Sequence, residues 1–80
     1  MLQLKIVSPE KIEYDGVAER ILVPGTMGQF EILNDHAPII STLQKGMVEY
    51  TTTEGKTSLE ILGGFVEVQK NVVSLCVEMA

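Results

Sequence analysis

The sequence contains no tryptophan, one cysteine and one histidine among its 80 residues. Because Cys76 has no second cysteine to pair with, an internal disulfide is excluded, and the composition is typical of a reduced, intracellular protein. Uninterrupted apolar runs reach three or four residues, at 21–23 and 37–40, whereas a membrane-spanning helix needs ~20. Residues 1–11 hold no basic stretch followed by an apolar one, so we expect no signal peptide.

Positive charge is also scarce. Six lysines and arginines stand against eleven aspartates and glutamates, which gives a net charge of −5. The basic residues are scattered along the chain, and only two tyrosines and two phenylalanines are available to stack on bases. Phosphate backbones and anionic lipid headgroups bind clustered cations, so neither nucleic acid nor direct membrane insertion is expected.

Hydrophobic residues make up 45% of the chain, which is enough for a packed core. Turn-forming residues interrupt the sequence at short intervals, among them Asp15-Gly16, Asn34-Asp35, Gly63-Gly64 and Lys70-Asn71. The segments between turns are mostly four to eight residues long and rich in Val, Ile, Thr and Leu. This spacing predicts one all-β domain over residues 1–80, either a sandwich or a barrel.

Alternation of apolar and polar residues assigns faces to the predicted strands. Leu2, Leu4 and Ile6 share one face, and residues 17–23 form one alternating segment in which Val17 falls on the same face as Ile21 and Val23. Residues 65–80 also fit a helical stripe, but five valines and the turn candidate at 70–71 favour two strands. Residues 41–45 fit either a strand or a loop, and of the two we predict a strand.

Catalytic and metal-binding candidates are few. Asp35-His36 is the one histidine-bearing cluster, and a hydrolase would need Ser41 or Ser8 brought to His36 in space. No G-x-S-x-G elbow is present, and one histidine with one distant cysteine is a weak start for a zinc site. We therefore interpret His36 as a loop residue that caps a turn, and Cys76 as an inert, buried or half-buried thiol.

The segment 24–28, Pro-Gly-Thr-Met-Gly, contains glycines but lacks the G-K-[ST] of a phosphate-binding loop. Two interpretations remain open: a plain turn, or an exposed loop that presents Met27 and Phe30 to a partner. Composition and spacing thus indicate an acidic β-domain that works by binding another molecule, without identifying that molecule.

One stretch is much more specific than the rest. Residues 23–40, VPGTMGQFEILNDHAPII, resemble the signature of the epsilon subunit of the F-type ATP synthase, called delta in mitochondria. Residues 4–10, 46–50, 63–68 and 71–73 also agree with that family in order and spacing, so the resemblance covers the whole chain. The chain departs from the family at Glu31, where glycine is common, and at Asn34-Asp35, where Pro-Gly is common.

The resemblance implies a flattened two-sheet antiparallel β-sandwich in a non-catalytic rotor subunit of a proton-translocating F-type ATP synthase. Such a subunit links the gamma subunit to the c-ring in the central stalk and couples ion-driven rotation to ATP synthesis. It would sit peripherally at the cytoplasmic face of the bacterial inner membrane, without cofactor or metal. The inhibitory helices that usually follow this domain in the family are not carried over, because the sequence stops at Ala80.

Matching positions also imply contacts. The c-ring contact would comprise Thr26, Met27, Gly28, Gln29, Phe30, Glu31 and His36. Ser8 is a candidate contact with the gamma subunit. Glu31 would accept a charge-assisted hydrogen bond from an arginine common in the c-subunit loop, and His36 has a second interpretation as a pH sensor. The alternatives from other classes are a stand-alone β-sandwich adaptor for another protein, and a small hydrolase or metal enzyme that uses Asp35-His36.

Overall fold

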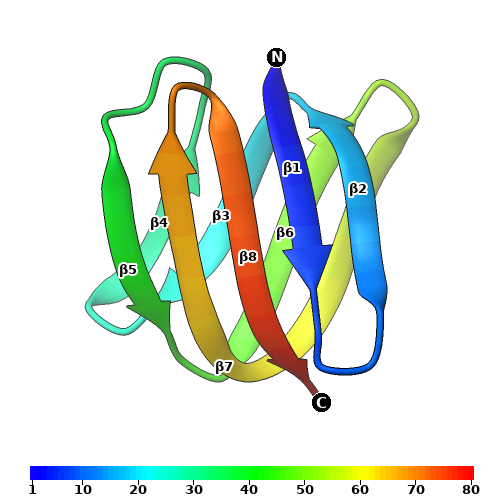
Figure 1. The fold of residues 1–80 in the computed structure, drawn as a ribbon, viewed down its shortest axis with the longest axis vertical. Helices are drawn as coiled ribbons and strands as arrows, with labels where there is room; N and C mark the ends of the chain where they lie inside the picture. The colour runs from blue at the N-terminus through cyan, green and yellow to red at the C-terminus, as the bar shows by residue number, and fades with distance from the viewer.

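The computed structural model describes residues 1–80, which form eight β-strands and no helix (Figure 1). The strands are β1 (Leu2–Val7), β2 (Ile12–Ala18), β3 (Arg20–Gly25), β4 (Gly28–Ile32), β5 (Ile39–Leu43), β6 (Gly46–Thr52), β7 (Gly55–Gln69) and β8 (Val72–Met79). The molecule measures 27 × 26 × 18 Å, so it is flattened along one axis. The prediction of an all-β fold is confirmed.

The strands lie in two layers, which share the 15-residue strand β7. The first half of β7 pairs with β6, which pairs with β3, and β3 pairs with β4. The second half pairs with β5 on one side and with β8 on the other, and β8 is followed by β1 and β2. In Figure 1 the layer with β1 and β8 lies in front of β3 and β6.

One strand pairing differs from the antiparallel expectation. β1 and β8 run parallel, with Gln3 opposite Val72 and Val7 opposite Cys76, whereas the other seven pairings are antiparallel. A parallel pair needs a long crossover, and here the rest of the chain supplies it. The first and last strands therefore lie side by side and point the same way (Figure 1).

The core between the layers consists of sixteen buried apolar residues and contains no buried polar or charged residue. The predicted inward face of the first strand is confirmed, because Leu2, Leu4 and Ile6 are all at most 1% exposed. The other core residues are Ala18, Ile21, Val23, Ile32, Leu43, Val48, Tyr50, Ile61, Val66, Val68, Val73, Leu75 and Val77.

The prediction of one alternating segment over residues 17–23 was wrong. β2 ends at Ala18 and β3 begins at Arg20, so the alternation restarts at Glu19, whose amide donates to the carbonyl of Thr51. As a result Ala18 is buried beside Ile21, while Val17 faces solvent. A change of strand resets which parity of residue points inward.

Two predicted turns were also wrong, because Asp15-Gly16 lies within β2 and Gly63-Gly64 within β7. The pairing of β7 with β8 shifts register between Ile61 and Gly63, and Gly64 has a φ of +149°. A Cβ at Gly64 would collide with the carbonyl of Cys76. These glycines allow β7 to pass from one layer to the other.

The predicted division of residues 65–80 into two strands around Lys70-Asn71 is confirmed. The strand predicted at 41–45 exists as β5 but covers Ile39–Leu43, so the prediction was wrong for the last two residues. At that point the amide of Gln44 leaves the sheet and donates to the carbonyl of Pro24 at 2.8 Å.

Candidate partner-binding surfaces

The β3–β4 hairpin carries the first candidate surface. Its tip is the two-residue turn Thr26-Met27, closed by the pairing of Gly25 with Gly28. Gly28 has a φ of +126°, which residues with a side chain rarely adopt. Gly25 is also constrained, because an added Cβ would lie 2.7 Å from the carbonyl oxygen of Gly28.

Hydrogen bonds fasten the hairpin tip to β5. The amide of Thr26 donates to the carbonyl of Thr42 at 3.1 Å, and the two threonine hydroxyl oxygens lie 2.8 Å apart. Beyond these anchors the side chain of Met27 is 98% exposed. The tip thus presents a flexible apolar side chain from a fixed backbone, which suits contact with another protein.

The side chains of β4 divide between the two faces of their layer. Phe30 packs against the core, whereas Gln29 and Glu31 face solvent. Beside Phe30 an open groove of about 370 Å³ runs between the hairpin and β5, and Met27 and the largely exposed Ile40 lie along it. The side chain of Gln29 also lines this groove, so the groove is apolar with a polar group at its wall.

Glu31 already has a partner within the chain. Its carboxylate lies 3.5 Å from the Nε of Arg20 on the neighbouring strand β3, and both side chains are well exposed. An arginine on another protein would have to compete with Arg20 for this carboxylate.

His36 lies in the 33–38 loop, at the opposite end of β4 from the hairpin tip (Figure 1). Its amide donates to the carbonyl of Leu33 at 3.1 Å, and its Nδ1 lies 2.7 Å from the carbonyl oxygen of Ala37. The structure therefore agrees with the interpretation of His36 as a turn residue. Its ring forms a tilted pair with that of Phe30, with the two centroids 6.5 Å apart. Six of the seven predicted contact residues lie on the hairpin and β4, and His36 adjoins them through Phe30.

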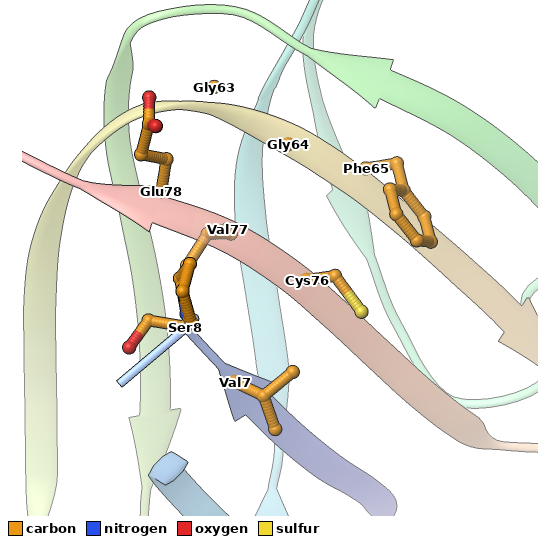
Figure 2. A pocket seen from close by; sticks show the side chains of 9 residues that line it. Val7, Ser8, Gly63, Gly64, Phe65, Cys76, Val77 and Glu78 are labelled. Carbon is orange, nitrogen blue, oxygen red and sulfur yellow. The ribbon is translucent and has the colours of Figure 1, made fainter. Parts of the chain in front are cut away.

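The second candidate surface surrounds Ser8, at the end of β1. An open groove of about 540 Å³ lies beside Ser8, with Gly63 and Gly64 at one wall. Figure 2 shows that Val7, Cys76 and Phe65 come from three adjacent strands, and they occupy directly opposed register positions. The hydroxyl of Ser8 donates to the carboxylate of Glu13 at 2.9 Å.

The residues considered for catalysis are not brought together. The hydroxyl of Ser8 binds Glu13, that of Ser41 donates to the carbonyl of Thr42 at 3.1 Å, and neither hydrogen-bonds to His36. No group of three or more His, Cys, Asp or Glu side chains is placed to hold a metal ion. Cys76 is partly buried, as predicted.

Sequence reasoning missed two outward-facing apolar residues, Ile40 and Phe65, and the contact between Asp35 and Asn71. The alternation of β5 and β7 carried a signal for the first two, because each lies one position from a buried or half-buried neighbour. No local pattern indicated the contact between Asp35 and Asn71, since these residues are 36 positions apart in the sequence.

Comparison with known proteins identifies the family. The family described as "ATP synthase, Delta/Epsilon chain, beta-sandwich domain" matches residues 1–80. The chain belongs to this family. Among the ATP synthase epsilon chains it resembles, that of Leptospira borgpetersenii is 42% identical over 74 residues, or 92% of this chain and 58% of the relative. The epsilon chain of the bacterium Gloeothece citriformis is 38% identical and covers 99% of this chain and 57% of its own length.

Solved structures show the same sandwich fold. A chain of the Euglena gracilis mitochondrial ATP synthase superposes with a TM-score of 0.88 at 22% identity, covering 95% of this chain and 49% of its own length. A chain in the central stalk and c-ring structure of the Tetrahymena thermophila enzyme gives a TM-score of 0.80 at 19% identity, with coverage of 96% and 63%. The β-sandwich prediction is confirmed, as is the expected membership in a family of non-catalytic ATP synthase subunits.

The chain spans less than two thirds of the length of the curated relatives it matches, at 58% for the Leptospira borgpetersenii protein. It corresponds to the β-sandwich part of the delta/epsilon family. None of its elements is a helix that could cross a lipid bilayer.

Proposed function

We propose that this chain is the β-sandwich part of a non-catalytic rotor subunit in the central stalk of a proton-translocating F-type ATP synthase. In this role it links the gamma subunit to the c-ring and couples ion-driven rotation to ATP synthesis. The observation that carries the proposal is the match of all 80 residues to the delta/epsilon β-sandwich family. The bacterial relatives support a peripheral position at the cytoplasmic face of the inner membrane.

The hairpin is the proposed c-ring contact, through Thr26, Met27, Gly28, Gln29, Phe30 and Glu31, together with His36. Its anchored tip and exposed Met27 support this assignment. The groove beside Ser8 is the proposed gamma contact, because apolar side chains of three strands gather there. No cofactor is required for either contact.

Co-purification from native membranes tests the proposal. The affinity-tagged chain, expressed in the organism of origin and extracted in mild detergent, is expected to recover the gamma subunit and the c-ring in constant ratio. Recovery of a different protein without either subunit would instead support the stand-alone adaptor and overturn the rotor role.

A variant pair tests the c-ring contact. Met27→Asp places a charge at a fully exposed tip, so it should leave the fold intact and reduce recovery of the c-ring. Val17→Asp is the control, because Val17 is 41% exposed and lies on β2 opposite Gln3, away from both the hairpin and Ser8. If both variants recover the c-ring equally well, the hairpin is not part of the contact with the c-ring.

A further inference from the structure

Two turns that are distant in the sequence are joined by a reciprocal pair of hydrogen bonds. The amide of Asp35 donates to the side-chain oxygen of Asn71 at 2.6 Å. In return, the side-chain nitrogen of Asn71 donates to Oδ1 of Asp35 at 3.2 Å. Together these bonds fasten the 33–38 loop to the turn between β7 and β8.

The Asn71 side of this pair is itself held in place. Its carbonyl accepts the amide of Gln3 at 2.8 Å, which ties the β7–β8 turn to β1. Asp35 and Asn71 have φ angles of 64° and 63°, in the left-handed region that asparagine and aspartate tolerate better than other residues with side chains. The residue types at both positions thus suit the backbone as well as the hydrogen bonds.

Asp35 precedes His36, whose amide and ring bind within the same loop. We propose that Asn71 is a positioning residue, whose side-chain amide holds the 33–38 loop and His36 in the conformation that meets the c-ring. A loop fixed before association loses less conformational entropy when it binds. This inference rests on the proposed function, in which His36 is a partner contact.

Substitutions that respect the backbone isolate the side-chain bonds. Asn71→Gly keeps the positive φ and deletes both side-chain atoms that bind Asp35. Lys70→Gly is the matched control in the same turn, because Lys70 has a φ of 53° and its side chain makes no hydrogen bond or ion pair. Asp35→Asn is the conservative variant, since asparagine tolerates this backbone and keeps an Oδ1 acceptor.

Amide hydrogen exchange tests the two hydrogen bonds between Asp35 and Asn71 in the isolated chain, without any partner. In Asn71→Gly the protection factor of the Asp35 amide should fall about fivefold to tenfold, which corresponds to the loss of one ordinary hydrogen bond. It should stay unchanged in Lys70→Gly and in Asp35→Asn. The Val66 amide in the buried part of β7 reports global unfolding, and the loss at Asp35 should exceed any loss there. An unchanged Asp35 amide in Asn71→Gly would overturn the proposal.

Binding of the purified gamma subunit and c-ring from the same organism tests the positioning role. Asn71→Gly should weaken binding of the c-ring about fivefold and leave binding of the gamma subunit unchanged, whereas Lys70→Gly and Asp35→Asn should bind both partners like the unaltered chain. Normal binding despite a loosened loop would reject the positioning role while leaving the proposed function intact. If the unaltered chain binds neither partner, the proposed function fails, and the positioning role fails with it even where the exchange result holds.

Discussion

The carboxylate of Glu31 lies 3.5 Å from the guanidinium of Arg20, across the pairing of β4 with β3. The two side chains are 40% and 58% exposed, so water and salt screen their attraction. Exposed pairs of this kind contribute about 0–1 kcal/mol to folding. In the proposed contact with the c-ring the pair would matter more, because it determines how freely Glu31 can reach another cation.

Substitution of this pair should separate stability from binding. Glu31→Gln is expected to change the midpoint of thermal unfolding by only a few degrees, and to weaken c-ring binding at low salt more than at high salt. Arg20→Gln releases the carboxylate and should strengthen that binding. Titration calorimetry at two salt concentrations measures both effects. If Glu31→Gln leaves binding unchanged at low and moderate salt, Glu31 makes no ionic contact with the c-ring.

Gly64→Ala should destabilise the fold strongly. The added Cβ would meet the carbonyl of Cys76 in the adjacent strand, at a φ of +149° that alanine adopts only with strain. We expect a loss of at least ~2 kcal/mol in urea unfolding. Gly55→Ala is the control, because Gly55 has a φ of +124° but open space around it, so it should lose only about 1 kcal/mol. Equal losses would show that backbone strain alone acts at both sites.

Ile61→Ala should show the importance of the point where β7 passes between the layers. Ile61 is fully buried and pairs with both Gly46 and Met79. Removing its side chain leaves a cavity, for which losses of about 2–5 kcal/mol are typical. Ile40→Ala on β5 is the control. Because Ile40 is 74% exposed, this substitution should change the free energy of unfolding by less than about 0.5 kcal/mol. A small loss for Ile61→Ala would mean that the layers close around the gap.

Alkaline pH should weaken the fold through Tyr14. Its pKa is raised above the ordinary 10.0, first by desolvation and then by the neighbouring Tyr50, Glu54 and Asp15. The phenol also donates a hydrogen bond to the carbonyl of Val17 at 2.7 Å. Because the folded state holds this proton more tightly, its contribution is fully present below pH 10 and is lost as pH rises through the raised pKa.

Unfolding in urea at pH 8 and at several values above pH 10, followed by circular dichroism, measures this effect, and tyrosinate absorbance of the folded protein reports when its tyrosines ionise. Tyr14→Phe should flatten the decline in stability above pH 10, since it removes the ionising group. A decline of the same slope in Tyr14→Phe would assign the alkaline loss to other groups.

Much of the fold follows from local pattern. Alternation placed Leu2, Leu4 and Ile6 in the core, and the turn at Lys70-Asn71 divided the last segment correctly. The turn predicted at Gly63-Gly64 was wrong, because the same backbone freedom that makes a turn also lets a strand bend and change layers. Val17 was assigned to the wrong face because one residue, Glu19, separates two strands without a glycine or proline.

The candidate surfaces were predicted less completely. The hairpin residues were found through family resemblance, but local sequence could not show that Arg20 already pairs with Glu31 or that the ring of His36 lies beside that of Phe30. The first fact depends on the register of β3 with β4, and the second on the path of the 33–38 loop. The contact of Asp35 with Asn71 depends on long-range order, because it joins residues 36 positions apart.

Strand β7 gives the sandwich a mechanical property that separate sheets would lack. Because one continuous backbone belongs to both layers, they are joined by covalent bonds as well as by side-chain packing. A twisting load applied to the β3–β4 side therefore reaches the β1–β8 side through the main chain, and slippage of one layer over the other would have to break the pairings of β7. In a rotating shaft, such a part would transmit torque with little elastic lag.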